Sequence, residues 1–192
     1  MTQTVQSTNR LYPGLADSSI EFFADGNETK VILNSRVLPF SEVSFSIIQL
    51  LDEEIEKDSL VKIHLLDMHP TSKIKRTEQF AHCRLGGLDY QGDINGGQLQ
   101  EGEYWECPKR GNCKSEGILC KLPSYNGKQL QPQEVKLLQL TATNKTNEVI
   151  AEELNLPLGS FHKLKKILWS KLSIQTKQEG VMISFFLNLI QL

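Results

Sequence analysis

The sequence predicts an α+β protein in which a small α+β N-terminal domain, a cysteine-rich segment and an all-helical C-terminal domain follow one another. A hairpin pattern near residue 26, four cysteines within 38 residues, and three helical patterns between residues 130 and 174 support this division. We therefore expect regions at 1–82, 83–128 and 129–192. With 39% hydrophobic and 23% charged residues, the 192-residue chain has the composition of a globular protein.

Two patterns define the start of the N-terminal domain. Ile20–Phe23 and Lys30–Leu33 flank Asp25-Gly26-Asn27, and these turn residues accept the backbone of a tight hairpin. The segment Pro39-Phe40-Ser41 is expected to open a helix, because apolar side chains follow it at steps of three and four residues. These side chains are Val43, Ile47, Leu50, Leu51 and Ile55.

Three stretches lead from this helix to the cysteine-rich segment. Leu60–Leu66 is a short apolar run that fits a strand or a helix, and periodicity leaves both open. Thr71–His82 reads as a polar helix that places Cys83 just before the Gly86-Gly87 break. The chain from there to Gly102 is rich in Gly, Asp, Asn and Gln, so we expect a long loop that some tie must hold.

The C-terminal region has the pattern of three short helices joined by turns, which predicts a helix-turn-helix unit. At the second turn, Asn155 tolerates a left-handed backbone and Pro157 suits a first helical position. Five lysines and no acid lie between Leu158 and Lys177, although the whole chain has a net charge of -2. In the last helix, one face holds Phe161, Leu164, Leu168 and Leu172, and the other holds His162, Lys163, Lys166 and Ser170.

Residues 130–190 resemble the DNA-binding domain of LuxR-type (GerE-like) bacterial transcription regulators. The family's L-T-x-x-E start, its N-x-x-I-A-x-x-L helix and its final helix ending in K-L each have a counterpart in this sequence. The counterparts are Leu130-Gln131-Pro132-Gln133-Glu134 with Leu138 and Leu140, Asn147–Leu154, and Ser160-Phe161 with Lys171-Leu172. The resemblance implies a bacterial or phage-type regulator of transcription that binds double-stranded DNA.

Carried over position by position, the resemblance places DNA contacts on five residues of this chain. His162, Lys163 and Lys166 lie near the start of the recognition helix, and Lys145 and Asn147 lie near the start of the preceding helix. A concentrated set of lysines is also what a phosphate-binding surface requires. The alternative is an ordinary helical hairpin whose lysines are simply solvated.

The segment from Gln178 to Leu192 is predicted to be a further helix, apolar nearly all round and buried. In the resembled family a fourth helix often mediates pairing, which implies a homodimer through this helix. Packing onto the chain's own N-terminal domain is the alternative.

The four cysteines predict a metal site. Cys83, Cys107, Cys113 and Cys120 lie in a stretch with little apolar content, which burial alone could not order. Disulfides are reduced in the cytoplasm, so zinc in a tetrahedral four-thiolate site is the simplest interpretation. The spacings contain no C-x₂-C pair, and an iron-sulfur cluster, thiol-based redox sensing or plain burial stay open. His82 could replace a thiolate as ligand.

The sequence argues against two other classes of protein. It contains no Gly-rich phosphate loop, G-x-S-x-G or H-E-x-x-H motif, so we do not expect an enzyme. The most apolar run, Val181–Leu192, is shorter than the roughly 20 residues that cross a bilayer, and no signal peptide is visible. We therefore expect a cytoplasmic protein without a membrane partner. The second function that stays open is a metal-stabilised module that docks another protein.

Overall fold

The structure is a computed structural model that describes residues 11–102 and 104–190. It consists of two compact units, residues 1–102 and residues 103–192, and each unit is described by itself. The helices and small antiparallel sheets confirm a mixed α+β class. The boundary between the units lies inside the stretch 83–128, so the cysteine-rich segment is divided between them.

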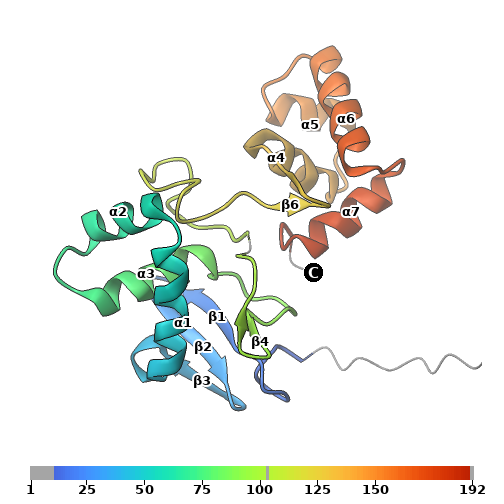
Figure 1. The fold of residues 1–192 in the computed structure, drawn as a ribbon. Helices are drawn as coiled ribbons and strands as arrows, with labels where there is room; N and C mark the ends of the chain where they lie inside the picture. Colours follow the sequence, from blue (N-terminus) through green and yellow to red (C-terminus); the bar gives the residue numbers. More distant parts are fainter. Residues whose placement is uncertain (1–10, 103, 191–192) are drawn as a thin grey trace, which may run out of the picture. The chain divides into compact units, whose positions relative to one another are not determined.

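Unit 1 is built on a three-stranded antiparallel sheet, β1 (Glu21–Asp25), β2 (Glu28–Leu33) and β3 (Arg36–Pro39), drawn in blue in Figure 1. The predicted hairpin is confirmed, and Gly26 takes the positive φ of its turn. Strand β3 was not predicted from the sequence. Its turn, Asn34-Ser35, has positive φ at both residues, an arrangement that usually signals itself through glycine.

Three helices complete unit 1: α1 (Phe45–Glu56), α2 (Ser59–Met68) and α3 (Lys73–Arg84). Helix α3 packs on β1 and β2, and α1 packs on α3 (Figure 1). The expected helix start at Pro39–Ser41 was wrong, because these residues enter a short 3-10 turn (Phe40–Glu42) that buries Phe40, and α1 begins only at Phe45. The stretch Leu60–Leu66, for which the sequence allows a strand or a helix, lies in helix α2, and the Asp58 side chain caps the start of this helix.

The chain from Gly86 to Gly102 is held within unit 1 by hydrogen bonds. It contains a small hairpin, β4 (Ile94–Asn95) and β5 (Gln98–Leu99), and Ile94 bridges to Ile20 beside β1. Two buried acidic side chains add hydrogen bonds, because Asp93 Oδ2 accepts the N–H of Phe22 at 2.7 Å and Glu21 Oε1 accepts that of Asp89 at 2.9 Å. Hydrogen bonds therefore hold this part of the predicted loop, and no metal is needed there.

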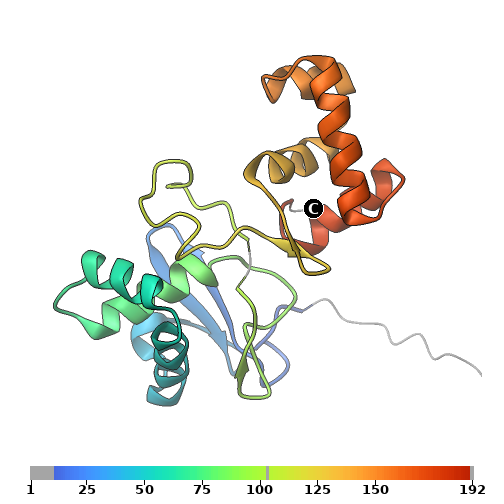
Figure 2. The ribbon, with the colours of Figure 1, turned by 45° about the horizontal axis from the view of Figure 1, so that its top comes forward.

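Unit 2 begins with turns, followed by a small hairpin and four helices. The hairpin pairs β6 (Ser124–Tyr125) with β7 (Lys128–Gln129), and the helices are α4 (Pro132–Thr141), α5 (Asn147–Glu153), α6 (Leu158–Leu172) and α7 (Lys177–Phe186). Figure 2 shows α6 as a long helix with α5 near its start and α7 after its end.

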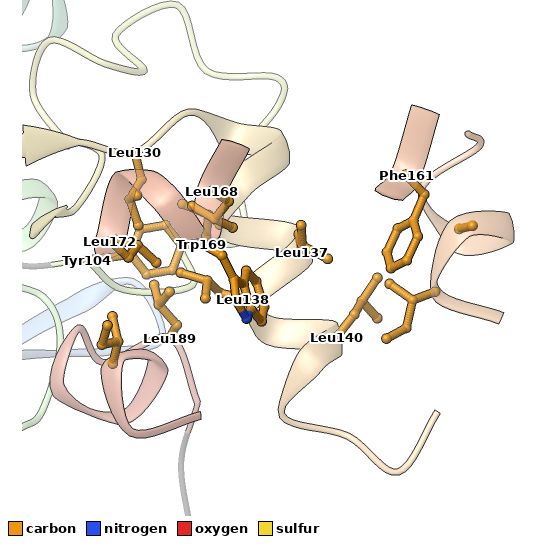
Figure 3. Close-up of a cluster of buried hydrophobic side chains, with 14 residues drawn as sticks. Tyr104, Leu130, Leu137, Leu138, Leu140, Phe161, Leu168, Trp169, Leu172 and Leu189 are labelled. Atoms are coloured by element: carbon orange, nitrogen blue, oxygen red, sulfur yellow. The ribbon is translucent and has the colours of Figure 1, made fainter. Parts of the chain in front are cut away.

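One hydrophobic core joins the elements of unit 2 (Figure 3). Leu137 and Leu138 of α4 pack in it with Phe161 and Leu168 of α6, and all four are fully buried. Tyr104, from the segment before the helices, belongs to the same cluster. The helical unit therefore extends upstream of residue 129.

Helix α7 covers α4 through one face only. Ile183 is buried, and the Ser184 hydroxyl donates to the carbonyl oxygen of Leu138 at 3.3 Å. Met182 and Phe186 are 58% and 59% exposed, so the prediction of a helix buried all round was wrong. The helix ends at Phe186, and the last two residues of the predicted range, Gln191 and Leu192, lie outside the described residues.

Candidate nucleic-acid interface and cysteine segment

The turn between α5 and α6 sets the direction of the candidate recognition helix. Asn155 has a φ of 53°, and the N–H of Leu156 returns to the carbonyl oxygen of Ala151 at 2.9 Å, which closes the end of α5. Pro157 occupies the position just before α6, and its carbonyl oxygen accepts the first helical hydrogen bond, from Phe161. A helix, a sharp turn and a second helix thus follow as the sequence predicts.

Helix α6 presents one face to the core and another to solvent. Phe161, Leu168 and Leu172 are buried, whereas His162, Lys163 and Lys166 are exposed. Among the described residues, neither Lys163 nor Lys166 has a hydrogen-bond or ion-pair partner. The structure therefore brings three of the five predicted DNA-contact residues together on one exposed face.

The other two predicted contacts are occupied within the protein. Lys145 Nζ forms an ion pair with Glu153 at 2.6 Å. The Asn147 side-chain oxygen accepts a hydrogen bond from Lys165 Nζ at 3.1 Å. Each would have to exchange its partner before it could contact a ligand.

Lys165 is a basic residue that was not among the predicted contacts. Its ammonium lies 5.2 Å from the centroid of the Trp169 ring and 6.0 Å from that of Phe161, so it stacks along α6. Lys165, Lys166 and His162 line one shallow hollow beside α6, together with Lys177 from α7. The four-residue step from Lys165 to Trp169 is the sequence signal that could have revealed this contact.

Acidic side chains border the basic face on the side of α5. Glu148, Glu152 and Glu153 are exposed on that helix. Hydrogen bonds from its own backbone N–H and from the Thr146 hydroxyl lower the pKa of Glu148, and the charge of nearby His162 lowers it further. A polyanion would therefore be attracted to α6 and repelled by the outer side of α5.

A buried ion pair fixes α6 to α4. Lys171 Nζ lies 2.6 Å from Glu134 Oε2, and the Glu134 side chain is only 8% exposed. The same carboxylate accepts the N–H of Gln131 at 2.7 Å and so caps the start of α4. These contacts give Glu134 and Lys171 a structural role in this chain.

The four cysteines fall in different surroundings, and the structure holds all of them as free thiols. Cys83 lies in the last turn of α3, in unit 1, where it accepts a hydrogen bond from Gln79 Nε2 at 3.2 Å. Cys107, Cys113 and Cys120 lie in unit 2, and only Cys120 of these is buried. The His82 ring nitrogen, the alternative ligand, lies 3.3 Å from the Thr29 hydroxyl.

The segment that carries the last three cysteines is held by turns rather than by regular structure. The N–H of Arg110 donates to the carbonyl oxygen of Cys107 at 3.0 Å, and the N–H of Glu116 donates to the carbonyl oxygen of Cys113 at 3.1 Å. Within residues 11–102 and 104–190, no three metal-ligating side chains are gathered closely enough to hold an ion. Soft thiolates are ligands that suit zinc or an iron-sulfur cluster, and the metal site stays a prediction.

Comparison with known proteins finds no significant match among protein-family models, curated proteins or solved structures. None of the described helices is both long and apolar enough to cross a membrane. The function of this chain must therefore be inferred from the geometry of α5, α6 and the cysteine segment.

Proposed function

We propose that the protein is a cytoplasmic bacterial or phage-type transcription regulator that binds duplex DNA through a LuxR-like helix-turn-helix. The observation that carries this proposal is the exposed face of α6, which holds His162, Lys163 and Lys166. Neither of the two lysines has an intramolecular partner among the described residues. An α-helix fits the major groove, and lysines on its outer face can reach phosphates and base edges.

The distribution of charge supports the same proposal. Residues 103–192 hold 12 basic and 8 acidic side chains, a formal net charge of +4, whereas residues 1–102 hold 9 basic and 15 acidic ones, a net charge of -6. A polyanion is therefore attracted to the unit that contains α6. Unit 1 adds repulsion, so binding should depend strongly on salt.

Binding to a fluorescent duplex of random sequence, measured by anisotropy at several salt concentrations, tests the proposal. If α6 and its surroundings neutralise about four phosphates, log K falls with log salt with a slope of roughly -3.6. Absence of binding at low salt, or a slope near zero, would rule out the DNA-binding function.

A homodimer through α7 belongs to this proposal. Met182 and Phe186 leave an apolar strip on the side of α7 that faces away from α4. Two paired copies would present two α6 helices to two half-sites. Sedimentation that shows only monomer at high concentration, with and without DNA, would exclude the pairing.

The cysteines are assigned to a metal in the same proposal, with Cys83, Cys107, Cys113 and Cys120 as ligands of zinc or, alternatively, of an iron-sulfur cluster. Turn-rich backbone around three of them supports a tie of this kind. Metal analysis and the absorption spectrum of protein purified without air decide between the two. If the protein contains neither zinc nor iron near one equivalent per chain, the cysteines would instead serve thiol redox chemistry or simply be buried.

A second candidate function is a module that docks another protein. It is favoured by an exposed apolar row on α2, formed by Leu60, Ile63 and Leu66, which are 57%, 53% and 48% exposed. Such docking need not lose affinity with added salt, so the same salt series separates the two functions.

A further inference from the structure

A second hollow in unit 2 lies apart from the basic face of α6. It has a volume of about 540 Å³ and lies between the cysteine segment and the outer side of α4. This volume is within the range of roughly 300–1,000 Å³ that small-molecule sites occupy. The apolar part of its wall consists of Tyr104, Pro108, Leu122, Pro132 and Val135, and the charged part of Glu106, Arg110, Glu116 and Lys136.

Arg110 has hydrogen-bonding capacity that the protein does not use. Its guanidinium lies over the Tyr104 ring, 4.4 Å from the centroid, and Nη2 donates to the carbonyl oxygen of Trp105 at 3.0 Å. Nε and Nη1 are buried and make no hydrogen bond with the described residues. The Glu116 carboxylate is 3.7 Å from Nη1, which is an ion pair but too far for a hydrogen bond. An unmet buried donor costs about 1–3 kcal/mol, and an anionic acceptor would remove this cost.

The two acids of the hollow already have donors of their own. Glu106 Oε1 accepts from Gln139 Nε2 at 2.7 Å, and Glu116 Oε2 accepts the N–H of Gly111 at 2.6 Å. Lys136, by contrast, is exposed and has no partner in the described part of the chain. The described groups of the hollow that lack a hydrogen-bond partner are therefore the Arg110 Nε and Nη1 donors and the charged Lys136 ammonium.

We propose that this hollow binds a small organic anion. A carboxylate on the ligand would lie between Arg110 and Lys136, turning Glu116 aside to reach Nη1. The apolar body would rest on Val135, Leu122 and the edge of Tyr104. A planar guanidinium pairs with a carboxylate in a defined geometry, so the ligand class is an organic carboxylate rather than a neutral or purely apolar molecule.

Binding of such a ligand would reach the cysteine segment. Glu116 and Gly111 are joined by a hydrogen bond, and Cys107 lines the same hollow. A ligand that moves Glu116 therefore alters the turns on which Cys107 and Cys113 lie. The inference does not depend on DNA binding, because no residue of the hollow belongs to α6.

The test uses the full chain labelled with ¹⁵N and titrated with benzoate, benzamide or inorganic phosphate. Benzoate should shift the amide signals of Gly111 and Lys136 in a saturable way. Benzamide, which lacks the charge, and phosphate, which lacks the apolar body, should shift them weakly. Benzamide or phosphate acting as strongly as benzoate, or absence of saturation with benzoate, would overturn the proposal.

Three variants locate the binding. Lys136→Gln should raise the Kd for benzoate about threefold, as expected for an exposed charge pair. Arg110→Gln should raise it at least roughly tenfold, because a hydrogen bond to a charged group is lost. Lys109→Gln removes an exposed charge that does not line the hollow, and it should leave the Kd unchanged. If Arg110→Gln loses its fold, the test is the comparison of the Kd for benzoate in Lys136→Gln with that in Lys109→Gln. Equal Kd values in these two variants would overturn the site.

Discussion

Two irregular segments of this protein are ordered by different means. Gly86–Gly102 in unit 1 is fastened beside β1 by the backbone bridge between Ile94 and Ile20 and by the buried carboxyl groups of Glu21 and Asp93. Tyr104–Pro123 in unit 2 has mainly local turns, the cysteines, the fully buried Leu119, and Tyr104 in the helical core. A chain without periodicity can thus be held by buried polar groups or by a few buried apolar side chains. The proposed metal would act on the second segment.

The anchor of the second segment offers the largest expected effect. Tyr104 is 5% exposed and packs in the cluster that includes Leu130 and Leu189. Tyr104→Ala should lower the free energy of unfolding of unit 2 by about 3–5 kcal/mol, as deletion of a buried aromatic ring does. Urea denaturation measures the loss.

Tyr90→Ala is the matched control for this variant. Tyr90 lies in the first segment and is 48% exposed, although it stacks on Tyr12. Its replacement should cost far less than that of Tyr104. Equal losses in the two variants would contradict the idea that Tyr104 anchors its segment.

The buried Glu21, which helps to hold the first segment, should make the stability of unit 1 depend on pH. Burial, with a contribution from the neighbouring charge of Asp89, raises the pKa of Glu21 to about 8 from its ordinary value of 4.5. Above the ordinary pKa the unfolded chain is ionised while the folded chain stays protonated. Stability should therefore fall by about 1.4 kcal/mol per pH unit as the pH rises from 4.5 to about 8, and should level off beyond.

Glu21→Gln should remove this slope, because the amide stays neutral at every pH. At pH 7 the variant should be more stable than the natural protein by up to about 3 kcal/mol. Glu28→Gln, at an exposed residue on β2, is the control and should keep the slope. A parallel pH dependence in Glu21→Gln and the natural protein would disprove the role of this carboxylate.

The tie proposed for the second segment predicts a local effect. Cys113→Ser would leave an incomplete metal shell, and residues 104–123 should then become sensitive to protease, because metal-binding free energy is folding free energy in a segment held mainly by turns. The helices should survive, since Leu138 and Phe161 pack without the cysteines. Limited proteolysis followed by mass spectrometry locates the cuts. Cuts that are unchanged in this segment would mean that Cys113 does not hold it.

Much of the helical part could be predicted because its signals are local. The spacing of Phe161, Leu168 and Leu172 and the turn at Asn155 decided α6 and its direction. The β6–β7 hairpin was not predicted, although Asn126-Gly127, the strongest short hairpin signal, stands at its turn. This turn lies within the stretch 83–128, which the cysteines indicate as a metal-binding segment.

The remaining differences depend on contacts distant in sequence. The bonds from Glu21 to Asp89 and from Asp93 to Phe22 span 68 and 71 residues, and no periodicity reveals them. The ion pair of Lys145 with Glu153 and the bond of Asn147 with Lys165 likewise depend on the fold, so the sequence could not show that these two candidate contacts are occupied. The exposed triad on α6 needed only helical spacing, and it was predicted correctly as an exposed face.

The smallest change in stability should accompany the change that matters most for function. Lys163→Ala and Lys166→Ala remove exposed side chains and should leave the fold intact. Each should weaken binding to duplex DNA and reduce the slope of log K against log salt by about 1 if the lysine contacts a phosphate. A lysine that contacts a base edge should instead relax specificity at one position by roughly 1–3 kcal/mol. Lys57→Ala, on the surface of unit 1, is the matched control.

The most direct measurement is therefore the salt dependence of DNA binding in the double variant Lys163→Ala, Lys166→Ala beside the natural protein. We expect weaker binding at every salt concentration and a slope that is smaller by up to about 2, with circular dichroism and thermal unfolding unchanged. Unchanged affinity and slope in a folded double variant would mean that α6 does not read DNA, and the proposed function would then be wrong.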